Sequence, residues 1–212
     1  MALKAYKTLI RAAEDSFIIN KSRFIGYGRP CETEEEALDF LAEIRLRHRD
    51  ATHNCYAYII GPNMGVMRYS DDGEPGGTAG MPIIEVMKAR GVTNCAVVVT
   101  RYFGGVLLGA GGLVRAYTQG AVTAIDACGI GVMHPTARYM MDVPYPMLSR
   151  VEYFLKSAPV IVEDKDFSDV ITLTLLVKCA DEDKLLSDLT QLSEGRLEPM
   201  RFDETYMAWP EA

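Results

Sequence analysis

The sequence contains no apolar run close to the ~20 residues that cross a bilayer, and no secretory signal is found at its start. Its five cysteines are scattered along the chain and include no CxxC pair. These absences argue against a membrane protein, a disulfide scaffold and a structural zinc site. With 49% apolar and 24% charged residues, the composition is typical of a globular protein with reduced thiols, and we expect a cytoplasmic location.

The sequence also has no excess of positive charge, since its formal net charge is −7. Residues 1–135 contain 14 Lys and Arg against 14 Asp and Glu, whereas residues 136–212 contain 8 against 15. Non-specific binding to nucleic acid requires a basic surface, because it is driven by counterion release. The second half cannot supply such a surface, and the first half can do so only through a local cluster of cations.

A strand, a glycine-rich loop and a helix follow one another in the middle of the chain. Val97–Val99 is a β-branched run typical of a buried strand. Gly129 provides a helix stop. Before it, residues recur three and four positions apart and predict one apolar helix face, which consists of Leu113, Ala116, Tyr117, Gly120, Ala121, Ala124, Ile125 and Cys128. Arg101 and Arg115 flank five glycines, which are Gly104, Gly105, Gly109, Gly111 and Gly112. Because a helix N-terminus offers free N–H groups beside these cations, the loop is a candidate anion-binding site.

The glycine spacing matches neither common nucleotide-binding motif. A P-loop requires Lys and then Ser or Thr after its last glycine, but Gly109 is followed by Ala110 and Gly111. A dinucleotide fingerprint would require a third glycine at position 114, which is Val114. An alternative remains open, in which the glycines only allow close packing of the helix against the sheet.

A second loop is rich in acidic residues and contains three carboxylates within four positions, at Asp71, Asp72 and Glu74. Paired carboxylates can bind Mg²⁺ or act as acid and base. The alternative is a turn in which Asp71 or Asp72 caps local N–H groups. The spacing is not that of an EF-hand, so no metal ligand is assigned. Thr78, in the same loop, joins the three acidic residues as a candidate ligand-binding residue.

His53 and Cys55 fall on the same face of a predicted strand. The pair suggests a metal site or a Cys–His nucleophile, and the alternative is a partly buried histidine beside a core cysteine. The sequence identifies no third residue to orient such a nucleophile. No catalytic residue is therefore assigned, and His53 is retained as a candidate ligand-binding residue.

The residues before the two loops predict strands and one helix. Residues 4–30 alternate as strands do, with a hairpin-like break over residues 20–23. Thr33 and Glu36 form a capping box, which opens a helix that reaches about Arg49. The predicted buried face of this helix consists of Ala37, Leu38, Leu41 and Ile44.

Further strands are predicted over residues 55–60 and 66–69. Pro82 is expected at the first position of a helix that ends at Gly91. Residues 136–212 follow the order strand, helix, strand, strand, helix, strand, beginning at Ala137 and ending with a strand over residues 196–206. This is the ferredoxin-like βαββαβ order. The predicted fold class is α+β, with one domain over residues 1–135 and a second over residues 136–212.

Three blocks of the sequence resemble the YigZ/IMPACT family of small proteins. These blocks are His53–Tyr58, Ser70–Pro82 and Val99–Tyr117, and Lys21–Ile25 adds a weaker match. The resemblance covers about residues 15–130. The C-terminal segment is similar to the companion domain of bacterial members in pattern and position.

The resemblance implies a first domain folded like the second domain of a small-subunit ribosomal protein and domain IV of elongation factor G. It also implies a second domain like domain V of that factor. Eukaryotic relatives act in translational control through an additional domain that has no counterpart in this sequence. By fold analogy, we expect a translation-associated protein that binds RNA, the ribosome or a translation factor. In this hypothesis Arg101, Arg115 and the N–H groups of the glycine-rich loop contact phosphate, with no catalysis and no cofactor.

Two alternatives remain. The chain could be an enzyme or a small-molecule-binding protein whose ligand lies where His53, Asp72, Glu74, Arg101 and the glycine-rich loop converge. It could also be a protein-interaction module in which the glycines are purely structural. The sequence indicates no membrane partner and carries no signal for an oligomeric state. The first two hypotheses require the acidic and glycine-rich loops to lie side by side.

Overall fold

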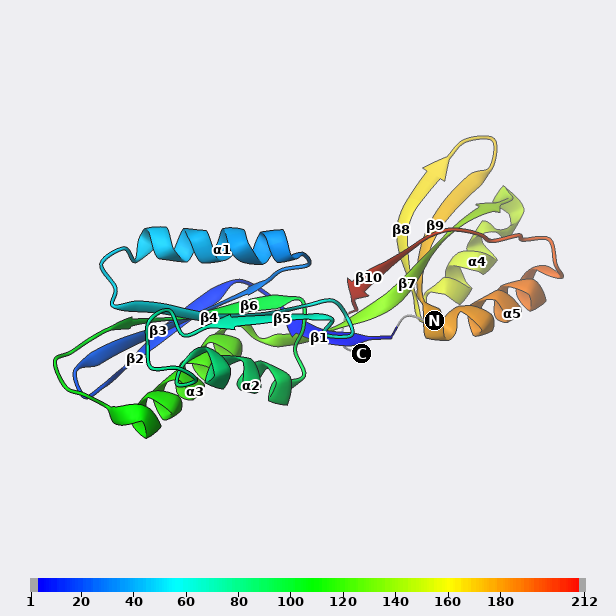
Figure 1. The fold of residues 1–212 in the computed structure, drawn as a ribbon. Helices are drawn as coiled ribbons and strands as arrows, with labels where there is room; N and C mark the ends of the chain where they lie inside the picture. Colours follow the sequence, from blue (N-terminus) through cyan, green and yellow to red (C-terminus); the bar gives the residue numbers. More distant parts are fainter. Residues whose placement is uncertain (1–3, 210–212) are drawn as a thin grey trace. The chain divides into compact units, whose positions relative to one another are not determined.

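The computed structural model describes residues 4–209 (Figure 1). The described chain divides into two compact units, one formed by residues 6–132 and the other by residues 133–209 with residues 4 and 5. Each unit combines an antiparallel sheet with helices, so the α+β class is confirmed. Within residues 4–209, no helix has both the length and the apolar character needed to cross a membrane.

The first unit is built on one five-stranded sheet in which all neighbours are antiparallel. From edge to edge its strands are β2 (Ala13–Ile19), β3 (Ser22–Pro30), β6 (Cys95–Tyr102), β4 (His53–Ile60) and β5 (Val66–Ser70). One face packs against α1 (Glu34–Arg47), and the other packs against α2 (Gly80–Arg90) and α3 (Gly109–Cys128) (Figure 1). A short strand, β1 (Tyr6–Leu9), forms a parallel bridge from Lys7 to Val92.

Helix α1 begins at the predicted capping box. The Glu36 amide donates to the Thr33 hydroxyl over 3.2 Å, and the Glu36 carboxylate accepts from the Glu32 amide over 2.7 Å. The prediction that Leu38 is buried is wrong, because this side chain is 49% exposed. Phe40 is buried in its place. The buried face starts at Ala37 and continues three, four and seven residues later, at Phe40, Leu41 and Ile44. The helix also ends two residues before the predicted Arg49.

The turn between β2 and β3 is tighter than predicted. Only Asn20 and Lys21 lie outside the strands, and both have positive φ, at 46° and 64°. Two central residues with positive φ match the right-handed twist of a hairpin. Ser22 and Arg23 therefore belong to β3 and not to the break.

Two glycines outside the glycine-rich loop set how closely α3 lies on the sheet. A Cβ atom added to Gly26 would lie 2.4 Å from the Gly120 carbonyl oxygen, and one added to Gly120 would lie 2.7 Å from Val99. Such distances leave no room for a side chain at either position. Close helix–sheet packing in this unit therefore depends on Gly26 and Gly120, neither of which belongs to the glycine-rich loop.

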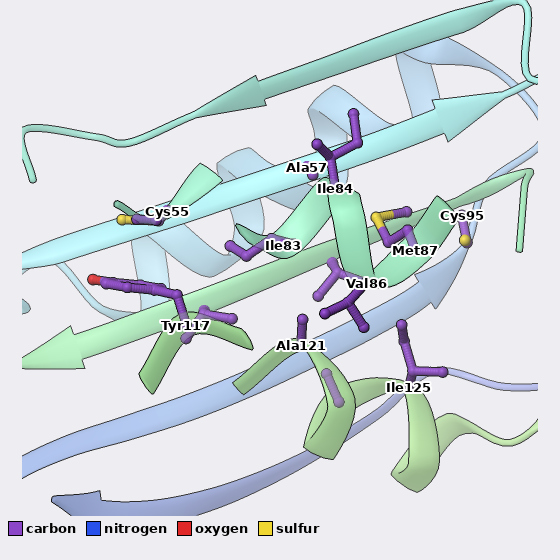
Figure 2. Close-up of a cluster of buried hydrophobic side chains, with 14 of the residues drawn as sticks. Cys55, Ala57, Ile83, Ile84, Val86, Met87, Cys95, Tyr117, Ala121 and Ile125 are labelled. Carbon is purple, nitrogen blue, oxygen red and sulfur yellow. The ribbon is translucent and has the colours of Figure 1, made fainter. Parts of the chain in front are cut away.

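A cluster of buried apolar side chains fills the space between the sheet and the two helices. Figure 2 shows side chains of α2 and α3, including Ile83, Met87 and Ile125, facing residues of the strands. In the same view the ring of Tyr117 extends from α3 toward Cys55 on β4. Helix α2 begins at Gly80, so Pro82 is its third residue and not its first as predicted.

The second unit has the predicted βαββαβ order. Its sheet order is β10-β7-β9-β8 with antiparallel neighbours, the split βαβ arrangement. The core lies between this sheet and two helices and contains Val151, Leu155, Leu173, Leu185 and Leu189. The elements are β7 (Ile130–Val143), η1 (Tyr145–Met147), α4 (Leu148–Leu155), β8 (Val160–Phe167), β9 (Ile171–Lys178), η2 (Cys179–Asp181), α5 (Glu182–Ser193) and β10 (Met200–Ala208).

The boundary between the units falls inside a strand. Strand β7 begins at Ile130 and continues through His134 and Pro135, so the predicted start at Ala137 is wrong. Pro135 pairs with Tyr206 of β10 without ending the strand. The last strand also lies further along than predicted, starting at Met200.

Candidate functional site

The acidic loop and the glycine-rich loop lie beside each other and border one cleft of about 400 Å³. The cleft is within the size range of small-molecule sites. Its lining residues come from the start of β4, from the acidic loop, from the end of β6 and from the first turn of α3. They are Thr52, His53, Gly73, Glu74, Pro75, Arg101, Phe103, Leu107, Leu108, Gly109, Ala110 and Leu113.

An ion pair forms the floor of this cleft. The Nη1 atom of Arg101 lies 2.7 Å from Oε1 of Glu74, and both side chains are buried, at 6% and 3% exposed. The Tyr117 hydroxyl donates to the same carboxylate oxygen over 2.7 Å, and Nη2 of Arg101 donates to the Ser22 hydroxyl over 3.4 Å. The pair therefore ties β6, the acidic loop, α3 and β3 together.

This geometry corrects one prediction about the arginines. Arg101 was expected to line an exposed surface with Arg115, but it is buried and its charge is balanced by Glu74. Its register partner across the sheet is Phe24, which belongs to the core beneath α3. Arg115 is exposed, and its Nη1 atom lies 3.7 Å from the Cβ position of Gly111 in the first turn of α3. Of these two arginines, Arg115 is therefore the one that an incoming anion can reach.

His53 is held in a defined tautomer above the ion pair. Its Nδ1 lies 2.8 Å from the backbone oxygen of Asp72. Because a carbonyl oxygen only accepts, Nδ1 carries a proton and donates it. The other ring nitrogen, Nε2, faces Oε2 of Glu74 at 3.8 Å.

Cys55 is a core thiol and not a nucleophile. It is fully buried, and its thiol donates to the backbone oxygen of Asp71 over 3.0 Å. Burial raises the pKa of this thiol well above its usual value, and burial likewise raises the pKa of the neighbouring Tyr117 hydroxyl. Of the two interpretations of His53 and Cys55, the structure therefore shows a partly buried histidine beside a core cysteine.

The acidic residues of the loop are engaged in shaping it. Asp71 accepts from the amides of Gly77, Ala79 and Gly80 at 2.8–3.0 Å and so holds the start of α2. Asp72 accepts from the Asn54 amide over 2.6 Å, and its other oxygen lies 3.3 Å from Arg45.

The rest of this loop is internally bonded as well. Thr78, which is 6% exposed, donates to the Pro75 carbonyl over 2.6 Å. Thr78 and the loop carboxylates are thus placed at the site mainly as supports. Among residues 4–209, no group of three or more His, Cys, Asp or Glu side chains is arranged to hold a metal ion.

The glycines of the candidate loop have different roles. A Cβ atom on Gly104 would lie 2.0 Å from the backbone of Lys21, so this glycine permits contact with the β2–β3 turn. Gly105 and Gly109 have φ of 81° and 67°, values that L-residues rarely adopt. Gly109, Gly111 and Gly112 were expected in the loop, but they form the first turn of α3.

The first turn of α3 leaves its amides open. None of the described residues caps its N-terminus with a side chain, and the turn contains no acidic residue. Gly109 and Ala110, two residues of this uncapped turn, line the cleft. This is a local positive potential from the helix dipole.

Sequence reasoning did not assign Tyr117, Ser22 or Phe103 to the site. Tyr117 was predicted on the buried face of its helix, and a buried tyrosine hydroxyl usually has a hydrogen-bond partner. That rule could have pointed to a polar group beneath α3. No local signal identifies Ser22, because its contact with Arg101 spans 79 positions of sequence.

Comparisons with known proteins agree with this architecture. The Impact N-terminal domain model matches residues 20–125, and a domain of unknown function, DUF1949, matches residues 141–196. A solved structure, described as the crystal structure of an hypothetical protein, is 30% identical with a TM-score of 0.62. It aligns over 95% of this chain and 99% of its own.

Curated relatives match over nearly their whole length. The IMPACT family member YvyE of Bacillus subtilis is 35% identical over 97% of this chain and 94% of its own. The IMPACT family member in pol 5'region of Thermus thermophilus is 41% identical, over 85% of this chain and 98% of its own. The IMPACT family member YigZ of Escherichia coli is 32% identical, over 88% of this chain and 92% of its own. Both halves of the chain are accounted for by these matches, and the chain belongs to the YigZ/IMPACT family.

Proposed function

We propose that this protein is translation-associated and that its first unit binds RNA, as it would on a ribosome. The observation that carries the proposal is the end of the unit where the β2–β3 turn meets the glycine-rich loop. There Lys21 contacts Gly104, and the exposed side chains of Phe103 and Arg115 belong to the same loop and the following helix. Cations beside an exposed aromatic ring and open helix amides are the groups that bind phosphate and unpaired bases.

The charge of these groups is available for a partner. Neither Lys21 nor Arg115 forms an ion pair with any residue between 4 and 209, whereas Lys88 and Arg90 on α2 are paired with Glu85 and Asp126. The first half of the sequence is also free of the acidic excess of the second half. The expected resemblance of the first unit to ribosomal and elongation-factor domains points in the same direction, as analogy.

The test is salt-dependent binding to ribosomes and to single-stranded RNA. The double variant Lys21→Ala/Arg115→Ala should bind about tenfold more weakly at low salt, and the slope of log K against log salt should fall by about 1.4 for two lost phosphate contacts. The control is Lys88→Ala/Arg90→Ala, which removes the same charge from cations that already have partners. No binding at low salt, or equal losses in both double variants, would contradict the proposal.

A further inference from the structure

The cleft combines an apolar wall with a polar end, and this combination suits a specific kind of ligand. The wall consists of Pro75, Phe103, Leu107, Leu108 and Leu113. Phe103 is 44% exposed and Leu107 is 85% exposed, although both are large apolar side chains. A planar apolar group bound against them would remove this surface from water.

Phe103 is held as a platform. The Arg101 guanidinium lies 5.3 Å from the centre of its ring, within the range of a cation–π contact. Arg101 is itself fixed by Glu74 and Ser22, so the ring rests on an anchored neighbour. An anchored, half-exposed aromatic ring is a surface on which a nucleobase can stack.

The polar end attracts a negative group. Gly109 and Ala110, in the uncapped first turn at the positive end of α3, line the cleft, and Arg115 lies over the same turn. A second observation is independent of the helix. Arg101 is 95% buried and lines the cleft, yet within the described chain its Nε atom has no hydrogen-bond partner. The floor therefore holds one N–H donor without an acceptor, although the Glu74 carboxylate balances the charge of the guanidinium.

The geometry points to one nucleotide as the occupant, with its base against Phe103 and the leucines and its phosphate at the first turn of α3. The cleft volume of about 400 Å³ is sufficient for such a ligand. His53 adds a polar group to the lining, because its Nδ1 is fixed by the Asp72 carbonyl and its Nε2 faces the Glu74 carboxylate.

Two molecules carry this same combination of base and phosphate: a free nucleoside monophosphate, and an RNA strand with an unpaired nucleotide. The second source rests on the proposed function, while the first does not. Calorimetric titration of the full chain with AMP, CMP, UMP and inorganic phosphate tests the cleft by itself. We expect saturable binding in which AMP exceeds CMP and UMP, because its larger base covers more of the apolar wall, and phosphate alone is the weakest.

Substitution of Ala110 tests where the phosphate lies. Ala110 is exposed in the first turn of α3, so Ala110→Asp places a carboxylate at the helix N-terminus, where it favours the fold but repels an anion. Ala110→Asn adds the same bulk without the charge. AMP should bind Ala110→Asp roughly tenfold more weakly than Ala110→Asn. This factor corresponds to the loss of one hydrogen bond to a charged group. Both variants should retain the wild-type unfolding midpoint or exceed it.

Two results would overturn the inference: no saturable binding of any of the three mononucleotides, or equal affinity of AMP for the two Ala110 variants.

Competition between AMP and RNA then identifies the source of the bound nucleotide. If AMP displaces a short single-stranded RNA, the cleft takes a nucleotide of the strand. If AMP binds and does not displace the RNA, the cleft holds a free nucleotide, and the RNA lies elsewhere. Failure of RNA binding with intact AMP binding would refute the proposed function alone.

Discussion

Arg101 and Glu74 form an ion pair of 2.7 Å inside the first unit, and neither side chain is more than 6% exposed. The pair joins the end of β6 to the acidic loop, two segments 27 positions apart in sequence. Taking two charges out of water is expensive, and their mutual attraction offsets this cost only while both are present. The geometry of the cleft therefore depends on both members of the pair, Arg101 and Glu74, being present.

The first prediction follows from this pair. Arg101→Met should lower the free energy of unfolding by about 3–5 kcal/mol, because it leaves the Glu74 carboxylate buried without its cation. The double variant Arg101→Met/Glu74→Gln should recover part of the loss. Urea unfolding followed by circular dichroism measures both. Arg68→Ala, which removes an exposed cation 3.9 Å from Glu34, is the control. An equal loss in the control would show that the buried pair has no special role.

The second prediction concerns the capping carboxylate of the acidic loop. Asp71 accepts three amide hydrogen bonds around the start of α2, and α2 has no other side-chain cap among the described residues. Asp71→Ala should therefore cost about 1–2 kcal/mol of unfolding free energy. Hydrogen exchange should also become faster at the amides of Gly77, Ala79 and Gly80. Asp169→Ala, at an exposed carboxylate in the second unit, is the matched control. Unchanged exchange at these three amides would contradict the capping role.

The third prediction concerns pH and His48. Its Nε2 lies 2.6 Å from the Tyr27 hydroxyl and its Nδ1 lies 2.8 Å from the Tyr102 hydroxyl, which donates to Asp50. Nδ1 therefore donates to Tyr102, and Nε2 accepts from Tyr27, as only a neutral ring can. Burial is the main cause that lowers the pKa of His48, with the Arg47 and Arg23 charges also lowering it and Glu14 and Asp50 opposing.

The direction of the effect on stability follows from this lowered pKa. Below the usual histidine pKa of 6.5, the unfolded chain takes up a proton that the folded chain does not, so stability falls as pH falls. Urea midpoints measured from pH 7.5 downward should decline in this window, and the decline should be shallower in His48→Gln. A slope identical to that of the unmodified chain would rule out His48 as its source.

Local periodicity predicted the helices and strands well where one face is buried. All eight residues expected on the inner face of α3, from Leu113 to Cys128, are buried. The alternating apolar positions of β9, which are Ile171, Leu173, Leu175 and Val177, are buried as well. Helix and strand faces follow from spacing alone, because each turn or pleat repeats the same geometry. The one wrong position on α1, Leu38, does not fit the three-, four- and seven-residue spacing from Ala37 that Phe40 does fit.

The function of Arg101 could not be predicted from its position in the sequence. An arginine beside a glycine-rich loop is consistent both with anion binding and with an internal ion pair. The outcome depends on the register that places Arg101 opposite Phe24 and His53, and on a loop that brings Glu74 to it. These are long-range relationships with no local signal. Adjacency of the two loops was foreseen as a requirement, whereas the buried floor between them was not.

The last prediction concerns the five thiols. Four of them, at Cys31, Cys55, Cys95 and Cys128, are buried, and burial raises the pKa of each thiol, for Cys31 to about 11. Cys179 is partly exposed. A thiolate-specific reagent at neutral pH should therefore label one cysteine of the folded chain, and all five after unfolding in urea.

The raised pKa of Cys179, which arises from burial and the nearby Glu182 and Glu204 carboxylates, makes even this reaction slower than that of a free thiol. The variant Cys179→Ser should lose the labelling of the folded chain, while Cys55→Ser should keep it. Mass spectrometry of the labelled peptides locates the modified residue. Rapid labelling of Cys55 in the folded chain would contradict its place in the core and would reopen the Cys–His interpretation of its strand.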